Sequence, residues 1–262
     1  MPLPENKSRT KERTMNEVAL PPDPAARLAA LRARIRALEG RGAGLAVPPV
    51  RLGPALTALL PESGLARTAL HELAGPAATL FAVAIAKAAL DRPGLLVWCL
   101  DEAGARARGI PWPPGLAARG IDPSRLLLVR APDGAALARA TEEALASPAA
   151  AVVVAEPARV DLDLGRRWQL AVERGGGLGL LLRAAPDPTP SAVATRWWIE
   201  PVAAEKGALR LRLVLRRSRS GIEGSVEVRV DEPGLALHPV AALADPATAP
   251  ACPASRRALE RD

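Results

Sequence analysis

The sequence predicts an α/β fold in which a mostly parallel, twisted sheet is flanked by helices and closed by an antiparallel hairpin. Short continuous apolar runs, typical of strands buried on both faces, alternate with helical segments about every 20–30 residues. After residue 190 the pattern changes to alternating apolar and polar residues. The chain has no tyrosine and one phenylalanine, so Ala, Leu and Val must fill the core. Alanine-rich helices pack closely on a sheet, which suits this class.

The parallel part is expected from residue 65 onward. An apolar segment at 65–74 leads to Gly75-Pro76, and residues 77–90 read as a helix. Strands buried on both faces are predicted at 95–100, 125–129, 149–155 and 179–182, and helical segments at 115–119, 134–146 and 164–174. Such alternation implies right-handed crossovers between parallel strands.

The antiparallel part is expected after residue 190. Alternation predicts strands at 196–201, 209–215 and 225–230, with a glycine-rich turn at 221–224 before the last of them. The core therefore spans residues 50–240. Residues 1–22 are polar and charged and are expected to be disordered, and residues 241–262 are expected to form a flexible tail.

Residues 23–49 are expected to hold an N-terminal docking helix and its linker. Asp23 is placed as the N-cap, Pro24 occupies the first helical position, and Gly40 ends the helix. Its apolar side chains make one narrow stripe, formed by Leu28, Leu31, Ile35 and Leu38. The stripe could dock on its own domain, on a second protomer or on a partner. We favour a protomer or a partner.

Composition limits the classes of function. The net charge of +7 suggests an acidic partner such as DNA, although a high-GC genome also enriches arginine. With two cysteines and two histidines, all far apart in sequence, disulfide frameworks, zinc sites and His-based catalysis have little material. No signal peptide or membrane-spanning run is visible, so we expect a cytoplasmic protein with no membrane partner.

The segment Gly75–Thr79 resembles an incomplete phosphate-binding loop. A strand, a glycine loop and a helix together form a cradle of backbone N–H groups for phosphates. A working loop reads Gly-x-x-x-x-Gly-Lys-Ser/Thr, because lysine neutralises the phosphates and the hydroxyl holds magnesium. The residues here are Gly75, Pro76, Ala77, Ala78 and Thr79, and Lys87 lies too far into the helix to reach back. We expect no ATP turnover and no required cofactor, and residual nucleotide binding stays open.

Acidic residues follow two of the predicted strands at the edge where α/β proteins bind ligands. Glu156 follows the 149–155 strand, where an ATPase usually places its magnesium-binding aspartate. Asp101 and Glu102 follow the 95–100 strand. Their position is compatible with ligand binding, and the alternative is that the two acids lie in a solvated loop.

Residues 209–219 are strongly basic and contain no acid. The five arginines are Arg210, Arg212, Arg216, Arg217 and Arg219. Strand alternation places the first three on one face and Leu209, Leu211, Leu213 and Leu215 toward the core. Without interleaved aromatic residues, such arginines favour DNA phosphates over bases. Partner binding and a solvated, charge-protected edge are the alternatives. Trp197 and Trp198 must point to opposite sides, so one is expected in the core and the other as an anchor for a partner.

Four stretches of the chain resemble the ImuA family over roughly residues 24–240. They are LAALRARIRALE at 28–39, LPESGLARTALHELAG at 60–75, GLAARGIDPSRLLLVRA at 115–131 with EEAL at 142–145, and PSAVATRWWIEP at 190–201. Residues 61–63 depart from the glycine-rich family pattern. The resemblance implies a RecA-like core that acts in SOS-induced mutagenic translesion synthesis. It implies as partners an ImuB-like homologue of Y-family polymerases, an error-prone C-family DNA polymerase complex and possibly RecA.

Comparison with RecA by element order adds two expectations. The regions that hold the DNA loops of RecA correspond here to the compact segments 157–163 and 184–192, neither of which is glycine-rich and basic as the RecA loops are. Arg217-Ser218-Arg219 resembles the Lys-x-Lys pair with which RecA reaches the ATP of its neighbour. The sequence therefore predicts a non-catalytic RecA-like accessory protein that binds partner proteins and DNA. The alternatives are a RecA-type ATP-dependent DNA-binding ATPase and a plain DNA-binding protein.

Overall fold

The computed structural model describes residues 23, 26–27, 47–56, 59–60, 64–185, 191–204 and 207–240. The chain divides into two units, residues 1–46 and 47–262. In the first unit, the Asp23 carboxylate accepts a hydrogen bond from the Ala26 N–H at 3.3 Å, as expected of an N-cap. The predicted stripe of Leu28, Leu31, Ile35 and Leu38 lies outside the described residues, as do residues 1–22 and the tail 241–262.

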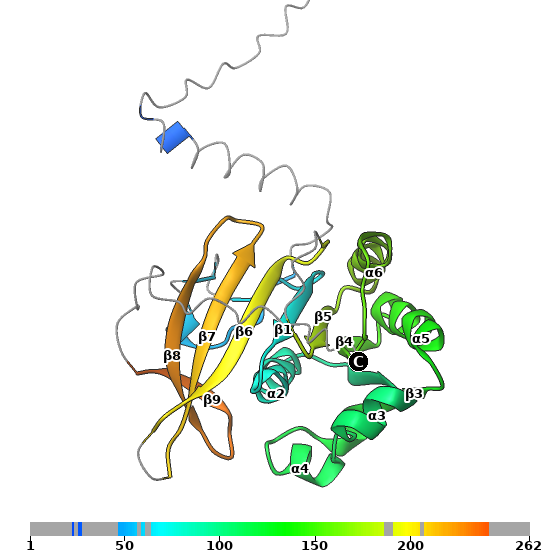
Figure 1. Ribbon diagram of the computed structural model, residues 1–262, viewed down its shortest axis with the longest axis horizontal. Coiled ribbons are helices and arrows are strands. Elements are labelled where there is room, and N and C mark those ends of the chain that lie inside the picture. The colour runs from blue at the N-terminus through cyan, green and yellow to red at the C-terminus, as the bar shows by residue number, and fades with distance from the viewer. Residues whose placement is uncertain are drawn as a thin grey trace, which may run out of the picture. The chain divides into compact units, whose positions relative to one another are not determined.

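A nine-stranded sheet dominates the described part of the second unit, with strand order β3-β2-β4-β5-β1-β6-β7-β8-β9 (Figure 1). From β3 to β6 in this order the neighbours are parallel, and from β6 to β9 they are antiparallel. The strands are β1 Leu70–Ala74, β2 Leu95–Asp101, β3 Leu126–Ala131, β4 Ala150–Ala155, β5 Leu178–Arg183, β6 Thr195–Val202, β7 Leu209–Ser218, β8 Gly224–Asp231 and β9 Ala236–Pro239. The predicted mostly parallel sheet with an antiparallel end is confirmed.

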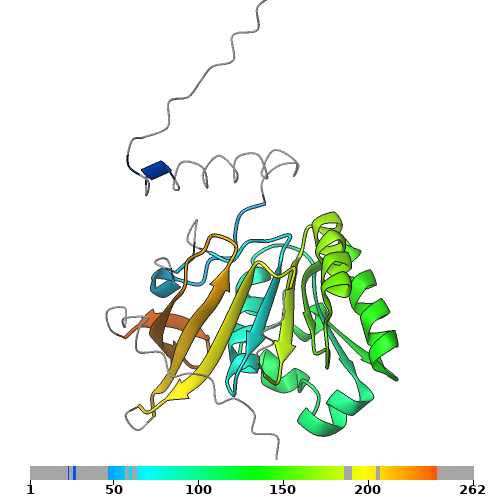
Figure 2. The ribbon, with the colours of Figure 1, turned by 45° about the horizontal axis from the view of Figure 1, so that its top comes forward.

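Helices cover both faces of the parallel half (Figures 1 and 2). They are α2 Ala78–Ala89, α3 Glu102–Arg108, α4 Pro113–Ala117, α5 Gly134–Ala146 and α6 Leu162–Gly175, with 3-10 turns η1 Pro54–Leu56 and η3 Pro123–Arg125. Residues of α2 and α4 pack in one apolar cluster and those of α5 and α6 in another. Strand β2 supplies Trp98 to the first cluster and Val97 to the second, because successive side chains point to opposite faces.

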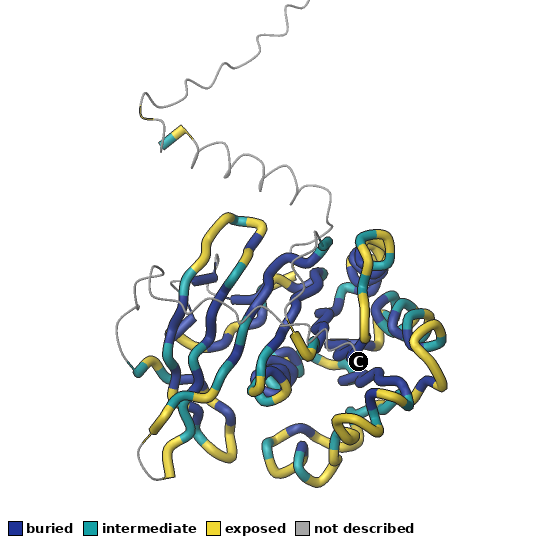
Figure 3. Tube along the Cα trace, in the orientation of Figure 1, coloured by how far each residue is buried: buried dark blue, intermediate teal, exposed yellow. Residues whose placement is uncertain are grey.

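The two clusters are held by large buried side chains. Trp197 and Phe81 meet edge to face with ring centroids 5.8 Å apart, which joins β6 to α2. Trp168 of α6 is fully buried on the opposite face. Figure 3 shows that the buried segments concentrate in the strands between the helical layers. One residue of the Trp197-Trp198 pair was expected in the core, and the structure shows that it is Trp197.

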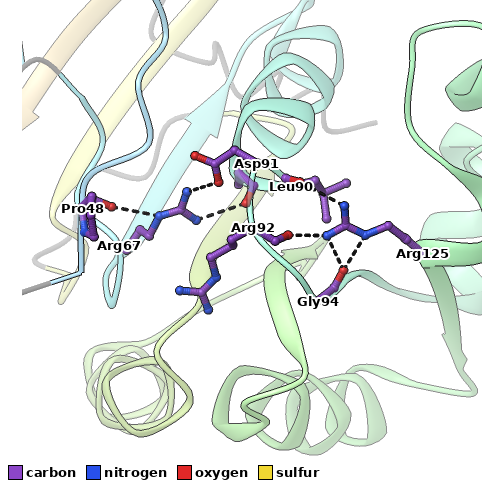
Figure 4. A network of polar contacts seen from close by, with 8 residues as sticks. Pro48, Arg67, Leu90, Asp91, Arg92, Gly94 and Arg125 are labelled. Carbon is purple, nitrogen blue, oxygen red and sulfur yellow. Dashed lines mark hydrogen bonds and ion pairs between the residues drawn. The ribbon is translucent and has the colours of Figure 1, made fainter. Parts of the chain in front are cut away.

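Two arginines donate hydrogen bonds to carbonyl oxygens at the C-terminal end of α2 and in the turn that follows it (Figure 4). Arg125 donates to the carbonyl oxygens of Leu90, Arg92 and Gly94 at 2.5–3.0 Å. Arg67 donates to the Ala89 carbonyl at 3.2 Å and pairs with Asp91 at 2.7 Å. The last carbonyls of a helix lack partners within the helix, so these side chains satisfy groups that would otherwise be orphaned.

The structure corrects the prediction for β3. The run Leu126–Val129 was expected to be buried on both faces, but β3 is the end strand of the sheet and its residues are mostly half-exposed or exposed. An apolar run does not report the lateral position of a strand in its sheet, so the sequence of an apolar edge strand looks like that of a central one.

The sequence did not predict helix α3 or strand β9. Asp101 and Glu102 do not lie in a loop but begin α3: Asp101 is its N-cap, and the carboxylate accepts a hydrogen bond from the Gly104 N–H at 2.6 Å. Strand β9 follows β8 through a short turn at 232–235. Both elements are short, so they carry little periodic signal.

Candidate functional site

The loop between β1 and α2 is the candidate site, and it contains only Gly75, Pro76 and Ala77. The predicted order of strand, glycine and helix is confirmed, with Ala78 and Thr79 in the first turn of α2. A complete phosphate loop needs more residues than this between its first glycine and the helix to curve around a phosphate. The loop is therefore too short to form that cradle.

The backbone of β6 lies directly against this loop. The Ile199 carbonyl accepts a hydrogen bond from the Ala77 N–H at 3.2 Å. Gly75 has a φ of 110°, and a Cβ atom at this position would overlap the same carbonyl oxygen. One N–H group at the start of α2 is thus occupied by a protein carbonyl, and the glycine is explained by this close approach.

Lys87 contacts another part of the chain and not the loop, as its position in the sequence suggested. Its ammonium group donates to the Gly234 carbonyl at 2.6 Å, which joins α2 to the turn between β8 and β9. Thr79 is exposed, and in the sequence it is the first hydroxyl residue after the loop. Neither residue supplies the lysine and hydroxyl pair that binds phosphate and magnesium in a complete loop.

The acidic residues at the carboxyl ends of the strands are all engaged. Glu156 is buried and accepts hydrogen bonds from Trp98 Nε1 at 2.7 Å and from Arg108 Nε at 2.9 Å. Glu102 pairs with Arg130 at 2.8 Å. In the described ranges, no group of three His, Cys, Asp or Glu residues is arranged to hold a metal ion.

A buried hydrogen-bond chain connects β1 and β6, and sequence reasoning missed it. His71 Nε2 donates to the Ala66 carbonyl at 2.8 Å, so Nδ1 accepts from the Thr195 hydroxyl at 2.7 Å. Trp197 Nε1 donates to the same hydroxyl oxygen at 2.7 Å. Burial lowers the pKa of His71 to about 4, so the ring is neutral at neutral pH. These groups meet only because β1 pairs with β6, a strand more than 100 residues later in the sequence. No local sequence signal could therefore have found them.

The arginines of β7 separate into groups with different surroundings. Leu211, Leu213 and Leu215 are buried as predicted, which places Arg210 and Arg212 on the other face. Arg212 lies between two carboxylates, at 2.8 Å from Glu227 and 3.3 Å from Glu200. The hydrogen bond to Glu227 raises the pKa of Arg212. This guanidinium is therefore largely neutralised by its neighbours.

Arg210 and Arg216 lie on either side of Arg212 along the strand. In both, Nε is buried and has no hydrogen-bond partner within the part of the chain that the structure describes. The guanidinium of Arg216 lies 5.5 Å from the ring centroid of Trp198, in a cation–π arrangement. Trp198 is half-buried and donates to Glu200 at 3.0 Å, so it is less exposed than the expected anchor.

Arg217 and Arg219 are exposed at the end of β7. Ser218 pairs with Thr195, the first residue of β6, whereas the Gly75 loop follows the last residue of β1. Because β1 and β6 are parallel, the two arginines lie beside the amino-terminal ends of these strands, whereas the loop follows the carboxyl end of β1. Arg219 also donates to the Ala192 carbonyl at 2.6 Å. Within one chain the pair does not approach the loop.

The two compact segments that correspond to the DNA loops of RecA are partly described. In 157–163, Asp161 caps α6 and its carboxylate accepts a hydrogen bond from the Leu164 N–H at 2.8 Å. In 184–192, residues 186–190 lie outside the described residues, and Ala192 packs near Gly165. The first segment therefore serves as the start of a helix.

Comparison with curated proteins gives a clear relationship. The chain is 33% identical over 221 residues to Protein ImuA of Caulobacter vibrioides, in each of two strains. The match covers 73% of this chain and 88% of that protein. No family model matches the sequence. In the described residues, no helix is long and apolar enough to span a bilayer.

Proposed function

The chain belongs to the ImuA family, and on this premise we propose that it is a non-catalytic, RecA-like accessory protein of SOS-induced DNA repair and mutagenic translesion synthesis. In this role it assembles partner proteins on damaged DNA and does not hydrolyse ATP. Its proposed partners are an ImuB-like Y-family polymerase homologue, an error-prone C-family DNA polymerase complex and RecA. We place its action in the cytoplasm.

One observation carries the non-catalytic part of the proposal. The Ile199 carbonyl takes the Ala77 N–H at the start of α2, in the place where a phosphate loop would offer this donor to a nucleotide. A carbonyl oxygen at this point also repels a phosphate oxygen, because both carry negative partial charge. Reopening the loop would require β1 and β6 to move apart.

The surroundings of Glu156 support the same proposal. A magnesium-binding acid needs a carboxylate that is free to coordinate the ion or its water shell. Both oxygens of Glu156 accept hydrogen bonds, and Arg108 supplies a positive charge in place of a metal. The acid at the end of β4 thus acts as a structural tie between β2, α3 and β4.

DNA contact is the second part of the proposal, and it rests on the exposed basic end of β7. Arg217 and Arg219 are exposed, and no carboxylate pairs with them in the described part of the chain. Arg210 and Arg216 are half-buried and form no ion pair with a carboxylate in the described residues, whereas Arg212 is neutralised. We assign phosphate contact to Arg210, Arg216, Arg217 and Arg219, and a structural role to Arg212.

Phosphate release tests the proposal directly. The purified full chain is incubated with ATP, magnesium and single-stranded DNA, with and without an ImuB-like partner. We expect release at the level of the protein-free control and capture of the partner by the chain. Turnover that disappears when Thr79 is replaced by alanine would instead establish a RecA-type ATPase. A Gly134→Ala variant serves as the matched control, since an added Cβ atom meets nothing within 4 Å there.

A further inference from the structure

The two edges of the sheet differ in how well they are protected. At one end, β9 is four residues long, ends in Pro239 and contacts η1. Gly53 approaches its Leu237 carbonyl so closely that a Cβ atom would lie 3.1 Å away. Short length, proline and a covering segment are the usual means by which proteins stop an edge strand from pairing with another chain.

The opposite edge, β3, has none of these features. Leu126, Leu127, Leu128 and Val129 are consecutive, and the strand has no proline and no irregularity in its pairing with β2. Leu127 is 49% exposed. Among the described residues, Leu127–Arg130 form strand pairs only with β2, so their outer backbone groups have no strand partner there. An apolar edge of this kind is a template for strand pairing.

We propose that β3 pairs antiparallel with β3 of a second copy of this chain, so that two sheets join across a two-fold axis. In a pairing centred on Leu128, Leu127 lies opposite Val129 of the other copy, on the α5 face of both sheets. Apolar side chains that are half-exposed in one chain then cover each other. The outer N–H and C=O groups of both strands find partners at the same time.

Charge on this edge is compatible with self-association. In the same pairing Arg130 lies opposite Leu126, so the two Arg130 residues are offset by about 13 Å along the strands. Each is also paired with its own Glu102 at 2.8 Å. Helix α5 beside the strand exposes Arg139 and Glu143, one charge of each sign. The β7 surface, in contrast, exposes arginines that would repel their copies.

The second copy is the favoured occupant because a two-fold contact requires a patch that complements itself. The edge of β3 meets this condition through its apolar residues and its balanced charges. A partner strand of different sequence would also pair with it, and the experiment separates the two cases. The inference is independent of the proposed function.

Sedimentation velocity on the full chain from about 1 to 200 μM tests the inference. We expect a concentration-dependent monomer–dimer equilibrium. Leu127→Arg should raise the dissociation constant by about tenfold or more, because it places a charge into a contact of two apolar side chains. The matched control is Leu170→Arg, which should leave the equilibrium unchanged. Leu170 is 60% exposed on α6, and this helix contacts β1, which three strands separate from β3.

Hydrogen exchange gives a second readout at the backbone. Amides in residues 126–130 should exchange more slowly at high protein concentration in the wild type and not in Leu127→Arg. If Leu127→Arg fails to fold, Leu127→Lys replaces it, since lysine occurs on natural edge strands and opposes their pairing. A monomer at every concentration, or a dimer that persists in the β3 variant, would overturn the proposal.

Discussion

Arg196 and Glu72 form a buried ion pair between neighbouring parallel strands. Arg196 Nε lies 3.1 Å from Glu72 Oε1, and both side chains are less than 10% exposed. The two residues are direct register partners of β6 and β1. The pair therefore links the antiparallel half of the sheet to the parallel half, close to the loop that follows β1.

Removing one partner of this pair should destabilise the protein strongly. We expect Glu72→Ala to lower the free energy of unfolding by about 3–5 kcal/mol, because Arg196 would keep its charge in a buried site. The double variant Glu72→Leu with Arg196→Met should recover most of this loss, since it leaves no buried charge. Urea denaturation measures both. A single variant that unfolds like the wild type would contradict the structural role of the pair.

His71 should make the stability of the protein depend on pH. Its pKa is about 4 in the folded chain, against an ordinary value of 6.5. As the pH falls from about 6.5 to 4, the unfolded chain takes up a proton that the folded chain does not, so stability is lost in this window. The loss from this residue is about 3 kcal/mol.

Proton NMR measures the titration directly, because the chain contains only two histidines. The ring signals of His71 should stay constant between pH 7 and 5, and a His238→Gln variant assigns them by elimination. Titration of the His71 ring near pH 6.5 would contradict the buried hydrogen-bond chain with Thr195.

Gly75 should tolerate no side chain. Gly75→Ala adds a Cβ atom that overlaps the Ile199 carbonyl, in addition to the strain of a positive φ. Gly109 also has a positive φ, but a Cβ atom there meets nothing within 4 Å, which makes Gly109→Ala the matched control. We expect the control to cost about 1 kcal/mol and Gly75→Ala clearly more. Thermal unfolding of the two variants would show equal losses if β6 did not occupy the loop.

The sequence was sufficient for most elements of the fold but not for their lateral contacts. Helix α5 begins and ends where its periodicity predicted, since Asp133 caps it and an Ala/Leu pattern fills it. The position of β3 at the edge was missed, because lateral neighbours leave no trace in a short apolar run. In the candidate site, the missing lysine was visible, but the Ile199 carbonyl was not. It comes from a strand far along the chain, and its position depends on the register of β1 and β6.

Arg125 should not be replaceable by lysine. Its guanidinium contacts three carbonyl oxygens after α2, and a single ammonium group cannot reproduce this fork. We expect Arg125→Lys to lower the free energy of unfolding by about 1–3 kcal/mol. Arg139→Lys on the exposed face of α5 is the control and should change little. Equal stability of the two variants would show that water replaces the lost contacts.

Charge reversal at the end of β7 should separate DNA contact from structural roles. Arg217→Glu with Arg219→Glu removes two exposed cations, so binding to single-stranded DNA should weaken. The negative slope of log affinity against log salt should become shallower by about 1.4. Arg212→Gln is the control, because this guanidinium is already paired with Glu227 and Glu200. It should lower stability through the loss of these contacts and leave the salt slope unchanged. Fluorescence anisotropy with a labelled oligonucleotide measures the slopes. A wild-type slope in the double variant would return Arg217 and Arg219 to the role of a solvated strand end.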